Sequence, residues 1–310
     1  MTHYLAFGRK LTSDFSFPEL PVAAADGPPA WTFELNRGPA PGEAERRLGS
    51  DKVYGAVQVH SWVRGSGLRL VYEDTGTFDV SADGSQLTWY PPLGPQPDEA
   101  ARADVIGRVL PMAMHLQGIF TLHASAVSTA GQTGIALMAP KGYGKSTLAA
   151  ALMAAGSRLI SDDAVPVAGL SDHVARLLPG IFQVRLWGDS AAQVGLGSPS
   201  AAGRKVVVTE FANDRLLTEP VPFAAAYVLA PVTANASGAV VERIRLTEIE
   251  GAMALVEHSK IGALLGGTEG PAFFDQAVSV ARRVPVYALR VARDLARLDE
   301  AARTMMAWHA

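Results

Sequence analysis

The stretch from Leu122 to Val167 constrains the fold of this chain more than any other. In it an apolar run, Ile135 to Met138, is followed by the turn formers of Pro140 to Gly144 and then by a segment rich in Ala, Leu and Met. This order predicts a strand, a loop and a helix that begins near Lys145. Glycines in such a loop adopt backbone angles closed to other residues, so successive backbone N–H groups can point at an anion.

The loop itself has the pattern of a phosphate-binding loop. From Ala139 the sequence reads A-P-K-G-Y-G-K-S-T, in which the lysine would reach the β- and γ-phosphates of ATP and the following serine hydroxyl would ligate Mg²⁺. The residues predicted to bind the nucleotide are Lys141, Gly142, Tyr143, Gly144, Lys145, Ser146 and Thr147. Ala139 stands where the usual pattern begins with Gly, and the alternative is a glycine-rich turn with a solvated lysine.

Composition limits the compartment and the partners. The chain has 310 residues with 48% hydrophobic content, enough for two domains with a sizeable core, and a net charge of −3 that argues against nucleic acid or an anionic membrane as the main partner. Cysteine is absent, which excludes disulfides and cysteine-ligated metals and suits a reducing cytoplasm. No apolar run reaches the roughly 18 residues of a membrane helix. We therefore expect a cytoplasmic protein.

The chain is expected to divide near residue 97. Residues 1–97 contain short segments rich in β-branched and aromatic residues, which predict a β-rich N-terminal lobe: HYLAF, WTFEL, VYGAVQV, LRLVYE and SQLTWY. Four prolines between Tyr90 and Pro97 are typical of a linker. A helical pattern from Asp98 to Leu116 follows, in which Pro111 should cause a kink or a break. Residues 98–310 then form the second, catalytic domain.

Beyond the loop the pattern predicts further strands and helices. Strands are expected at Ile181–Leu186, Lys205–Thr209, Ala225–Leu229, Val240–Leu246 and Val286–Leu289. Helices are expected at Trp187–Val194, from Thr247 to His258, at Ala272–Arg283 and at Leu295–Trp308. Thr247 and Glu250 have the spacing of a capping box, which fixes the start of one of these helices.

Asp162 and Asp163 are the strongest candidates for chemistry outside the loop. They end the strand candidate RLIS, where the chain returning to the sheet would deliver them beside the nucleotide. One carboxylate could accept the proton of an attacking hydroxyl while the other holds the magnesium ion. The alternative is a polar turn at a strand end. His123 is equally consistent with a core histidine and a functional one, and Arg185, like Arg204 and Lys205, with a phosphate ligand and an ordinary surface cation.

Together these residues resemble a known family. The segments LHASAV, APKGYGKST and LISDD, at this spacing, are similar to the HPr kinases and their smaller relatives among bacterial serine kinases. LLPGIFQVRLWGD, PFAAAYVLAP, VPVYALRVARDLARLDEAA and the opening FGRKLTSDFSFPELP resemble the related kinases found near peptide-modification gene clusters. The resemblance spans nearly the whole chain and is densest over residues 120–168.

The resemblance implies a fold and roles for individual residues. The fold is α/β (α+β), with a P-loop catalytic domain on a mixed sheet like that of phosphoenolpyruvate carboxykinase, preceded by the β-rich lobe. It implies that Asp162 is the base acting on a substrate serine, that Asp163 lies near the metal, and that His123 lies near the transferred phosphate. It also implies ATP and Mg²⁺ as cofactors and a possible homo-oligomer.

One departure from the family points to a different substrate. Laid on the L-E-I-R-G signature of the HPr kinases, Phe182 to Leu186 keeps the arginine as Arg185 but has Gln183 in place of the glutamate. A neutral amide is a poor magnesium ligand, which argues against phosphorylase activity and against HPr as the substrate. The relatives near peptide-modification clusters instead imply a serine of a peptide or small protein, with a lasso-peptide precursor as the leading hypothesis.

Three functions remain open from the sequence. The first is an ATP-dependent serine kinase, the second a nucleotide-binding regulator without phosphotransfer, and the third a small-molecule or HPr-type kinase of the same fold. The intact Lys145, Ser146 and aspartate pair favour catalysis over binding alone. The β-rich lobe has no glycine-rich anion site, so we expect it to help select the substrate through exposed strand edges.

Overall fold

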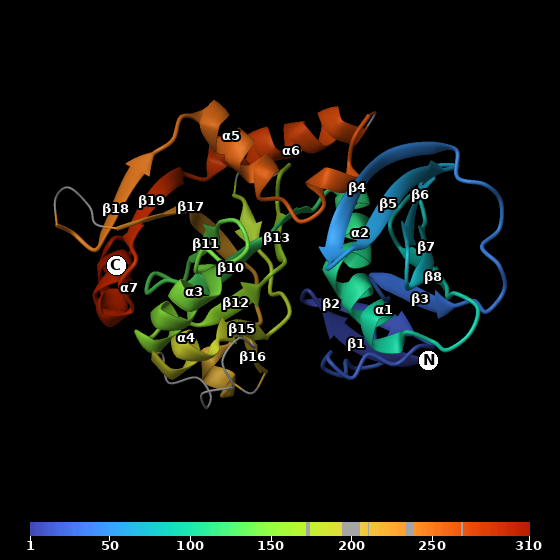
Figure 1. The fold of residues 1–310 in the computed structure, drawn as a ribbon, viewed down its shortest axis with the longest axis horizontal. Helices are drawn as coiled ribbons and strands as arrows, with labels where there is room; N and C mark the ends of the chain where they lie inside the picture. Colours follow the sequence, from blue (N-terminus) through green and yellow to red (C-terminus); the bar gives the residue numbers. More distant parts are fainter. Residues whose placement is uncertain (172–173, 194–204, 210, 234–237, 268) are drawn as a thin grey trace. The chain divides into compact units, whose positions relative to one another are not determined.

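The computed structural model divides the chain into two compact units (Figure 1). The first comprises Met1–Thr121 and Ser259–Gln276, and the second Leu122–His258 and Ala277–Ala310. The structure describes residues 1–171, 174–193, 205–209, 211–233, 238–267 and 269–310. The division differs from the expected boundary near residue 97, because residues 98–121 and a distant segment, 259–276, both belong to the first unit.

The first unit is built on an eight-stranded sheet of order β1-β2-β3-β8-β7-β6-β5-β4. Its strands are β1 (Thr2–Ala6), β2 (Arg9–Ser13), β3 (Trp31–Leu35), β4 (Arg46–Tyr54), β5 (Val57–Arg64), β6 (Gly67–Tyr72), β7 (Gly76–Val80) and β8 (Gln86–Tyr90). Strand β3 runs parallel to both of its neighbours and the other pairs are antiparallel. The core of this unit is aromatic: Trp31, Phe33, Phe78 and Trp89 are fully buried, and the rings of Phe78 and Trp89 stack at 5.9 Å.

A helix with a π-turn follows the sheet of the first unit. It runs through α1 (Asp98–Asp104), the π-helical η1 (Val105–Val109) and α2 (Leu110–Leu116). The expected break at Pro111 does not occur, because the proline lies in the first turn of α2, directly after the π-turn, where a missing N–H costs little. The short η3 (Gly262–Leu264) also belongs to this unit, and the Ser61 hydroxyl donates to the carbonyl of Leu264 at 2.5 Å.

The second unit contains the predicted strand, loop and helix. Strand β11 (Gly134–Met138) leads into the loop, and α3 (Lys145–Ala154) begins at the predicted lysine. The sheet order is β12-β10-β11-β17, with β19 beside β17, β18 beside β19, β14 on β17 and β13 on β14. Its other strands are β10 (Ala124–Ser128), β12 (Leu159–Asp162), β13 (Val165–Ala168), β14 (Arg176–Leu177), β17 (Val221–Val232), β18 (Val241–Arg245) and β19 (Val286–Ala292), and β9 (Phe120–Leu122) lies at the junction of the units.

Strand directions in this sheet place several strand ends at one edge. β11, β17 and β19 are mutually parallel, while β10 is antiparallel to both β11 and β12. It follows that β11, β12, β17 and β19 all point their carboxyl ends the same way, and that β10 begins at that edge. The predicted α/β class with a mixed sheet under the loop is confirmed.

Helices cover this sheet and close its core. α3 packs against the sheet and against α7 (Leu298–Ala307), which follows the 3₁₀ turn η4 (Leu295–Arg297). Leu137, Leu152, Tyr227 and Met305 are fully buried in this layer, and each such side chain contributes about 1.5–3 kcal/mol. α5 (Glu248–Glu257) begins with the predicted capping box, in which Thr247 and Glu250 each accept from the backbone N–H of the other.

The remaining elements complete the second unit. They are β15 (Val184–Trp187), which pairs with β16 (Lys205–Val208), α4 (Gly188–Gln193), η2 (Asn213–Arg215), and α6 (Glu269–Arg283), whose residues are shared between the units. The predicted strand at Ile181–Leu186 starts later than expected, at Val184, and Val194, the last residue of the predicted helix, lies outside the described residues. No helix among the residues that the structure describes is long and apolar enough to cross a membrane.

Candidate active site

The loop between β11 and α3 has the geometry of an anion cradle. Gly142 and Gly144 have φ of 89° and 92°, values that L side chains rarely adopt. A Cβ placed on either glycine would meet nothing within 4 Å, so open space adjoins the loop. The N-terminus of α3, a helix of ten residues, follows directly and adds its positive end. The backbone angles of both glycines are those that an anion-binding loop needs, and their contact with phosphate stays a prediction.

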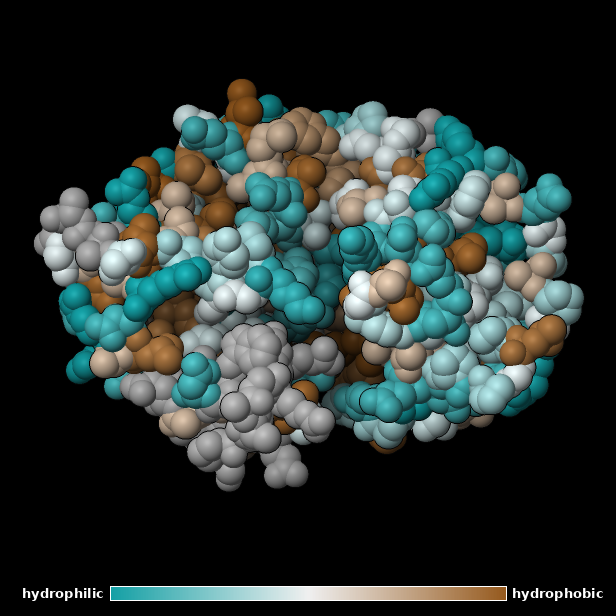
Figure 2. Space-filling model, viewed as in Figure 1, coloured by the Kyte–Doolittle hydropathy of each residue, from teal (hydrophilic) through white to brown (hydrophobic). Residues whose placement is uncertain are grey.

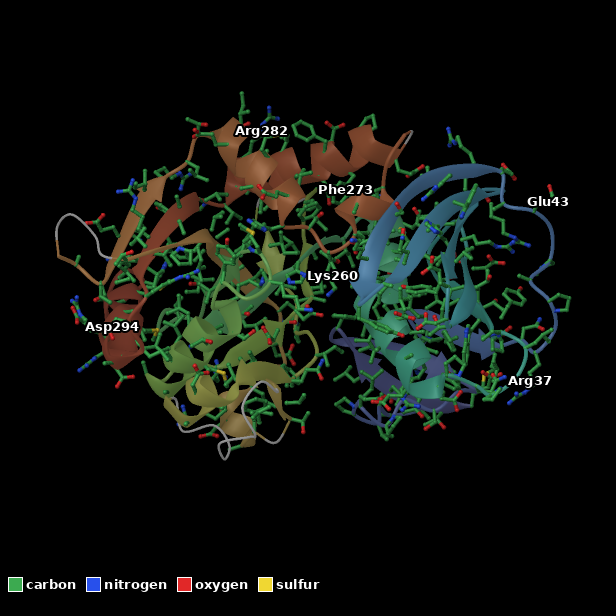
Figure 3. The ribbon with its side chains drawn as sticks, in the orientation of Figure 1. Arg37, Glu43, Lys260, Phe273, Arg282 and Asp294 are labelled. Carbon is green, nitrogen blue, oxygen red and sulfur yellow. The ribbon has the colours of Figure 1, made fainter. Side chains whose placement is uncertain are left out.

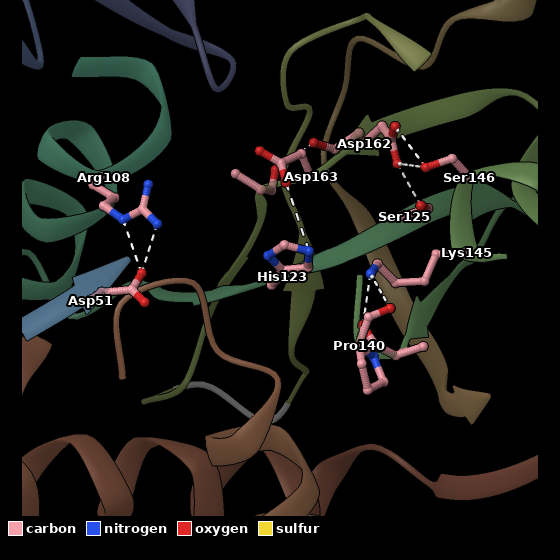
Figure 4. A network of polar contacts seen from close by, with 12 residues as sticks. Asp51, Arg108, His123, Ser125, Pro140, Lys145, Ser146, Asp162 and Asp163 are labelled. Atoms are coloured by element: carbon pink, nitrogen blue, oxygen red, sulfur yellow. Dashed lines mark hydrogen bonds and ion pairs between the residues drawn. The ribbon is translucent and has the colours of Figure 1, made fainter. Parts of the chain in front are cut away.

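Lys145 is folded onto the phosphate loop. Its Nζ donates to the carbonyl oxygens of Ala139 at 2.7 Å and Pro140 at 3.4 Å, and the residue is 8% exposed (Figure 4). A flexible ammonium with three donors can exchange these carbonyls for phosphate oxygens without moving the helix. Lys141 and Tyr143 extend from the exposed part of the same loop, and Thr147 follows Ser146 in α3.

Ser146 and Asp162 face each other at the start of α3. The Ser146 hydroxyl lies 3.1 Å from each carboxylate oxygen of Asp162. Asp162 ends β12, whose carboxyl end reaches the same sheet edge as the loop. A hydroxyl and a carboxylate together in this position can hold a hard divalent cation that is also bound by phosphates.

A buried hydroxyl fixes Asp162 from the other side. Ser125 and Asp162 are direct partners across β10 and β12, and the Ser125 hydroxyl donates to Oδ1 at 2.5 Å. Ser125 is fully buried and Asp162 is 6% exposed. The sequence reasoning missed Ser125, although the polar serine in the apolar run LHASAV was a signal that could have found it. Its contact with Asp162 depends on strand register, which the sequence does not state.

Asp163 turns the other way, toward His123. The two side chains come within 3.8 Å, from Asp163 Oδ1 to His123 Nε2, and both are partly exposed (Figure 4). Asp163 has φ of 74°, a left-handed conformation that costs a non-glycine residue on the order of 1 kcal/mol and that Asp adopts more readily than most residues. The structure thus joins His123 to Asp163 and Ser146 to Asp162. The predicted metal contact of Asp163 stays a prediction.

A second histidine, His258, borders this site and was also missed. It caps the C-terminus of α5, and its carbonyl accepts the backbone N–H of His123 at 2.7 Å. Burial lowers the pKa of its imidazole, the Glu257 carboxylate acts in the opposite sense, and the positive charge of Lys145 lowers it further. Burial and the Lys145 charge both favour the neutral form of the imidazole.

The residues fit a magnesium ion that is held jointly by the protein and by the phosphates of ATP, and they do not form a metal site by themselves. Among the described residues, no group of three or more His, Asp or Glu side chains could hold a metal ion without further ligands. Mg²⁺ commonly takes only one or two carboxylates together with substrate phosphates, so this donor set suits it. Arg185 lies in β15, but its side chain is outside the described residues, as are Arg204 and the side chain of Lys205.

Comparison with known proteins adds a similarity of structure. No family model matches the chain, and no curated protein sequence matches it. Among solved structures the chain is similar to the HPr(Ser) kinase/phosphatase from Coxiella burnetii, with a TM-score of 0.33 and 12% sequence identity. The match covers 61% of this chain and 95% of that chain.

Proposed function

We propose that the protein is an ATP-dependent kinase that transfers the γ-phosphate to a serine hydroxyl of a peptide or small protein. The observation that carries the proposal is the placement of Ser146 and Asp162, 3.1 Å apart, beside a loop with two left-handed glycines and a lysine. The loop and this hydroxyl–carboxylate pair would hold Mg-ATP in a binding protein as well as in a kinase. The buried Asp162 carboxylate, fixed by Ser125, adds a group at the γ-phosphate side that can take part in transfer.

The residues of this chain have distinct tasks in the proposed reaction. Lys145 exchanges its contacts with the loop carbonyls for the β- and γ-phosphates, and the loop N–H groups bind the same oxygens. Bound Mg²⁺ would be held by Ser146 and an aspartate, and it neutralises phosphate charge. Asp162 accepts the proton of the substrate serine as the phosphoryl group moves, and Ser125 fixes the carboxylate that does so.

His123 and Asp163 complete the proposed site. His123 directly precedes β10, at the sheet edge where the γ-phosphate would lie. Asp163 orients the His123 imidazole through the 3.8 Å contact. The contact between Ser146 and Asp162 favours an alternative assignment of roles to the two aspartates. In it, Asp162 and Ser146 would hold the metal, and Asp163 together with His123 would accept the proton. Asn variants separate the two, since the base variant keeps magnesium-dependent ATP binding and the metal-site variant loses it.

We propose a ribosomally made precursor peptide, such as a lasso-peptide precursor, as the substrate class. The support is the resemblance of the chain to kinases near peptide-modification gene clusters. The surface is compatible with a peptide partner: hydrophilic and hydrophobic residues are interspersed over the face in Figure 2, and the net charge is −3. The expected pairing of an extended peptide with a free strand edge has no support at β1, because its outer edge already hydrogen-bonds to Pro21 and Ala23.

The test is phosphorylation of cognate precursor peptides followed by mass spectrometry. With Mg-ATP we expect one or more phosphates on serine, none when the serine is replaced by alanine, and none when Mg²⁺ is removed by a chelator. Binding of Mg-ATP without transfer to any cognate peptide would support the regulator instead. Transfer to a small molecule or to HPr would assign a different acceptor.

A further inference from the structure

We propose that Tyr143 and Arg293 form the subsite for the nucleobase. The Arg293 guanidinium lies over the Tyr143 ring, with its Cζ 5.8 Å from the ring centroid. Tyr143 belongs to the phosphate loop, whereas Arg293 follows β19, far from the loop in the sequence. Neither the loop pattern nor the family resemblance gave Arg293 a role. The inference rests on the proposed binding of Mg-ATP and names where its base would lie.

Strand order gives the phosphate chain a direction. Asp162, at the end of β12, marks the metal and γ-phosphate side of the loop. On the opposite side of β11, the sheet continues through β17 to β19, and all three strands are parallel. Ligands of such sheets lie outside the carboxyl ends of the strands. A nucleotide with its γ-phosphate near Asp162 therefore extends its base toward the carboxyl ends of β17 and β19.

Arg293 is the first residue after β19, at that carboxyl end. Its backbone N–H donates to the carbonyl of Val232, the last residue of β17, at 2.9 Å, which anchors the arginine backbone to the sheet. The next residue, Asp294 (Figure 3), uses its carboxylate to cap the N–H of Ala296 at 3.0 Å. Asp294 is thus engaged in its own turn. Within the described part of the chain, the Arg293 side chain has no hydrogen bond or ion pair. Its guanidinium makes a cation–π contact with the Tyr143 ring.

Both side chains are accessible, and their chemistry suits a flat heterocycle. Tyr143 is 44% exposed, a large fraction for an aromatic side chain, and Arg293 is also exposed. Aromatic rings and guanidinium planes both stack on nucleobases, and stacking contributes about 1–3 kcal/mol per base. Tyr143 is held by the backbone of the phosphate loop, so the same loop that binds the β-phosphate also positions the ring.

The experiment compares two ligands that differ in the base. Mg-ATP occupies both the loop and the proposed subsite, whereas Mg-tripolyphosphate offers only the phosphate chain. Calorimetric titration of both into the wild type, Tyr143→Ala and Arg293→Ala measures the base contribution separately. Each variant should lower ATP affinity about 5- to 160-fold, with tripolyphosphate affinity unchanged within about twofold. Tyr143→Phe keeps the ring and should bind ATP like the wild type.

Arg297→Ala is the matched control. Arg297 is a nearby arginine on the following turn, paired with Glu300 at 2.8 Å, and its removal should leave both affinities unchanged. Equal weakening of ATP and tripolyphosphate by Arg293→Ala would overturn the proposal, because the guanidinium would then hold phosphate. Unchanged ATP affinity in both variants would overturn it as well. A wild type that binds neither ligand would instead remove the nucleotide site itself.

Discussion

Two carboxylate clusters, one in each unit, have similar surroundings but different capabilities. Asp162 in the second unit and Asp104 in the first are 6% and 2% exposed, and each accepts a hydrogen bond from a neighbouring hydroxyl, from Ser125 at 2.5 Å and from Thr75 at 2.6 Å. Asp162, however, also faces Ser146 at the mouth of a glycine loop. Asp104 ends α1, directly before the π-turn, in the unit that also contains Tyr72, whose buried hydroxyl has no hydrogen-bond partner among the described residues.

The difference shows what turns a buried carboxylate into a reactive one. Burial raises the pKa of Asp104 to about 7, Thr75 and Arg108 oppose the rise, and Asp74 adds to it. Arg108 itself is bound to Asp51 at 2.7 Å (Figure 4), so its charge is shared. The first cluster thus has a perturbed carboxyl but no anion cradle, whereas the Asp162 carboxylate lies beside the glycine loop. Perturbation alone is weak support for a catalytic role, and the open loop beside Asp162 carries more weight.

The largest expected effect separates the two aspartates by activity. Asp162→Asn keeps the shape of the side chain but removes the proton acceptor, so phosphopeptide formation at saturating Mg-ATP should fall about 10²–10⁴-fold. Asp104→Asn should leave this rate unchanged within about twofold, since it lies away from the loop in sequence and belongs to the first unit. Initial rates from mass spectrometry measure both. A similar loss in both variants would end the distinction drawn between the clusters.

The next effect concerns nucleotide affinity. Lys145→Ala removes a charge that lies against the phosphates, and truncating one member of such a pair costs enough to lower ATP affinity about 30-fold or more. Lys52→Ala, an exposed lysine of β4, is the matched change in the first unit and should have no effect. Calorimetric titration with Mg-ATP measures the affinity of both variants. Wild-type affinity in Lys145→Ala would remove the phosphate loop as the nucleotide site.

A smaller effect should appear in the pH dependence of stability. Because the pKa of Asp104 is raised to about 7 in the folded protein and is about 3.9 in an unfolded chain, folded Asp104 keeps a proton that the unfolded chain loses between these values. The free energy of unfolding should therefore fall as pH rises from about 4 to about 7. Asp104→Asn should reduce that fall by on the order of 2 kcal/mol in urea unfolding compared at about pH 5 and about pH 8.

Asp83 provides the control for this experiment. Hydrogen bonds from Ser81 and Ser85 lower the pKa of its carboxyl to about 2, so its titration is complete below the pH range compared. Asp83→Asn should consequently shift the stability curve without changing its slope between about pH 5 and about pH 8. An unchanged slope in Asp104→Asn would mean that Asp104 is ionised in the folded protein throughout this range.

The smallest effect tests the strain at Asp163. Glycine adopts φ near 74° without penalty, so Asp163→Gly should raise the free energy of unfolding by about 0.5–1 kcal/mol while it lowers phosphopeptide formation. Asp214→Gly is the matched change in the 3₁₀ turn η2, where glycine gains nothing, and it should be neutral or destabilising. Chemical denaturation measures both. A destabilised Asp163→Gly would show that the contact with His123 outweighs the backbone strain.

The sequence was sufficient for the parts of the site that are continuous in the chain. The strand, the glycine loop and the helix from Ile135 to Ala154 follow from local propensity and turn chemistry, and the structure has them where they were predicted. The capping box at Thr247 is a similar case. Each is determined by residues within a few positions of one another, so no long-range information is needed.

The parts that depend on strand pairing were not predictable. Ser125 reaches Asp162 only because of the register between β10 and β12, and Arg293 reaches Tyr143 only because β19 lies beyond β17 in the sheet. Proline content predicts a boundary near residue 97. That residues 259–276 belong to the first unit depends on tertiary packing. Local composition cannot indicate which distant segment packs on a lobe.

The most direct test of the central claim is a crystal structure with Mg²⁺ and a non-hydrolysable ATP analogue. We predict that Lys145 Nζ leaves the carbonyls of Ala139 and Pro140 for the β- and γ-phosphates, and that the metal lies on Ser146 with an aspartate of the pair completing its ligands. The loop N–H groups should bind the same phosphates. A nucleotide bound elsewhere, with Lys145 still on the loop carbonyls, would contradict the account.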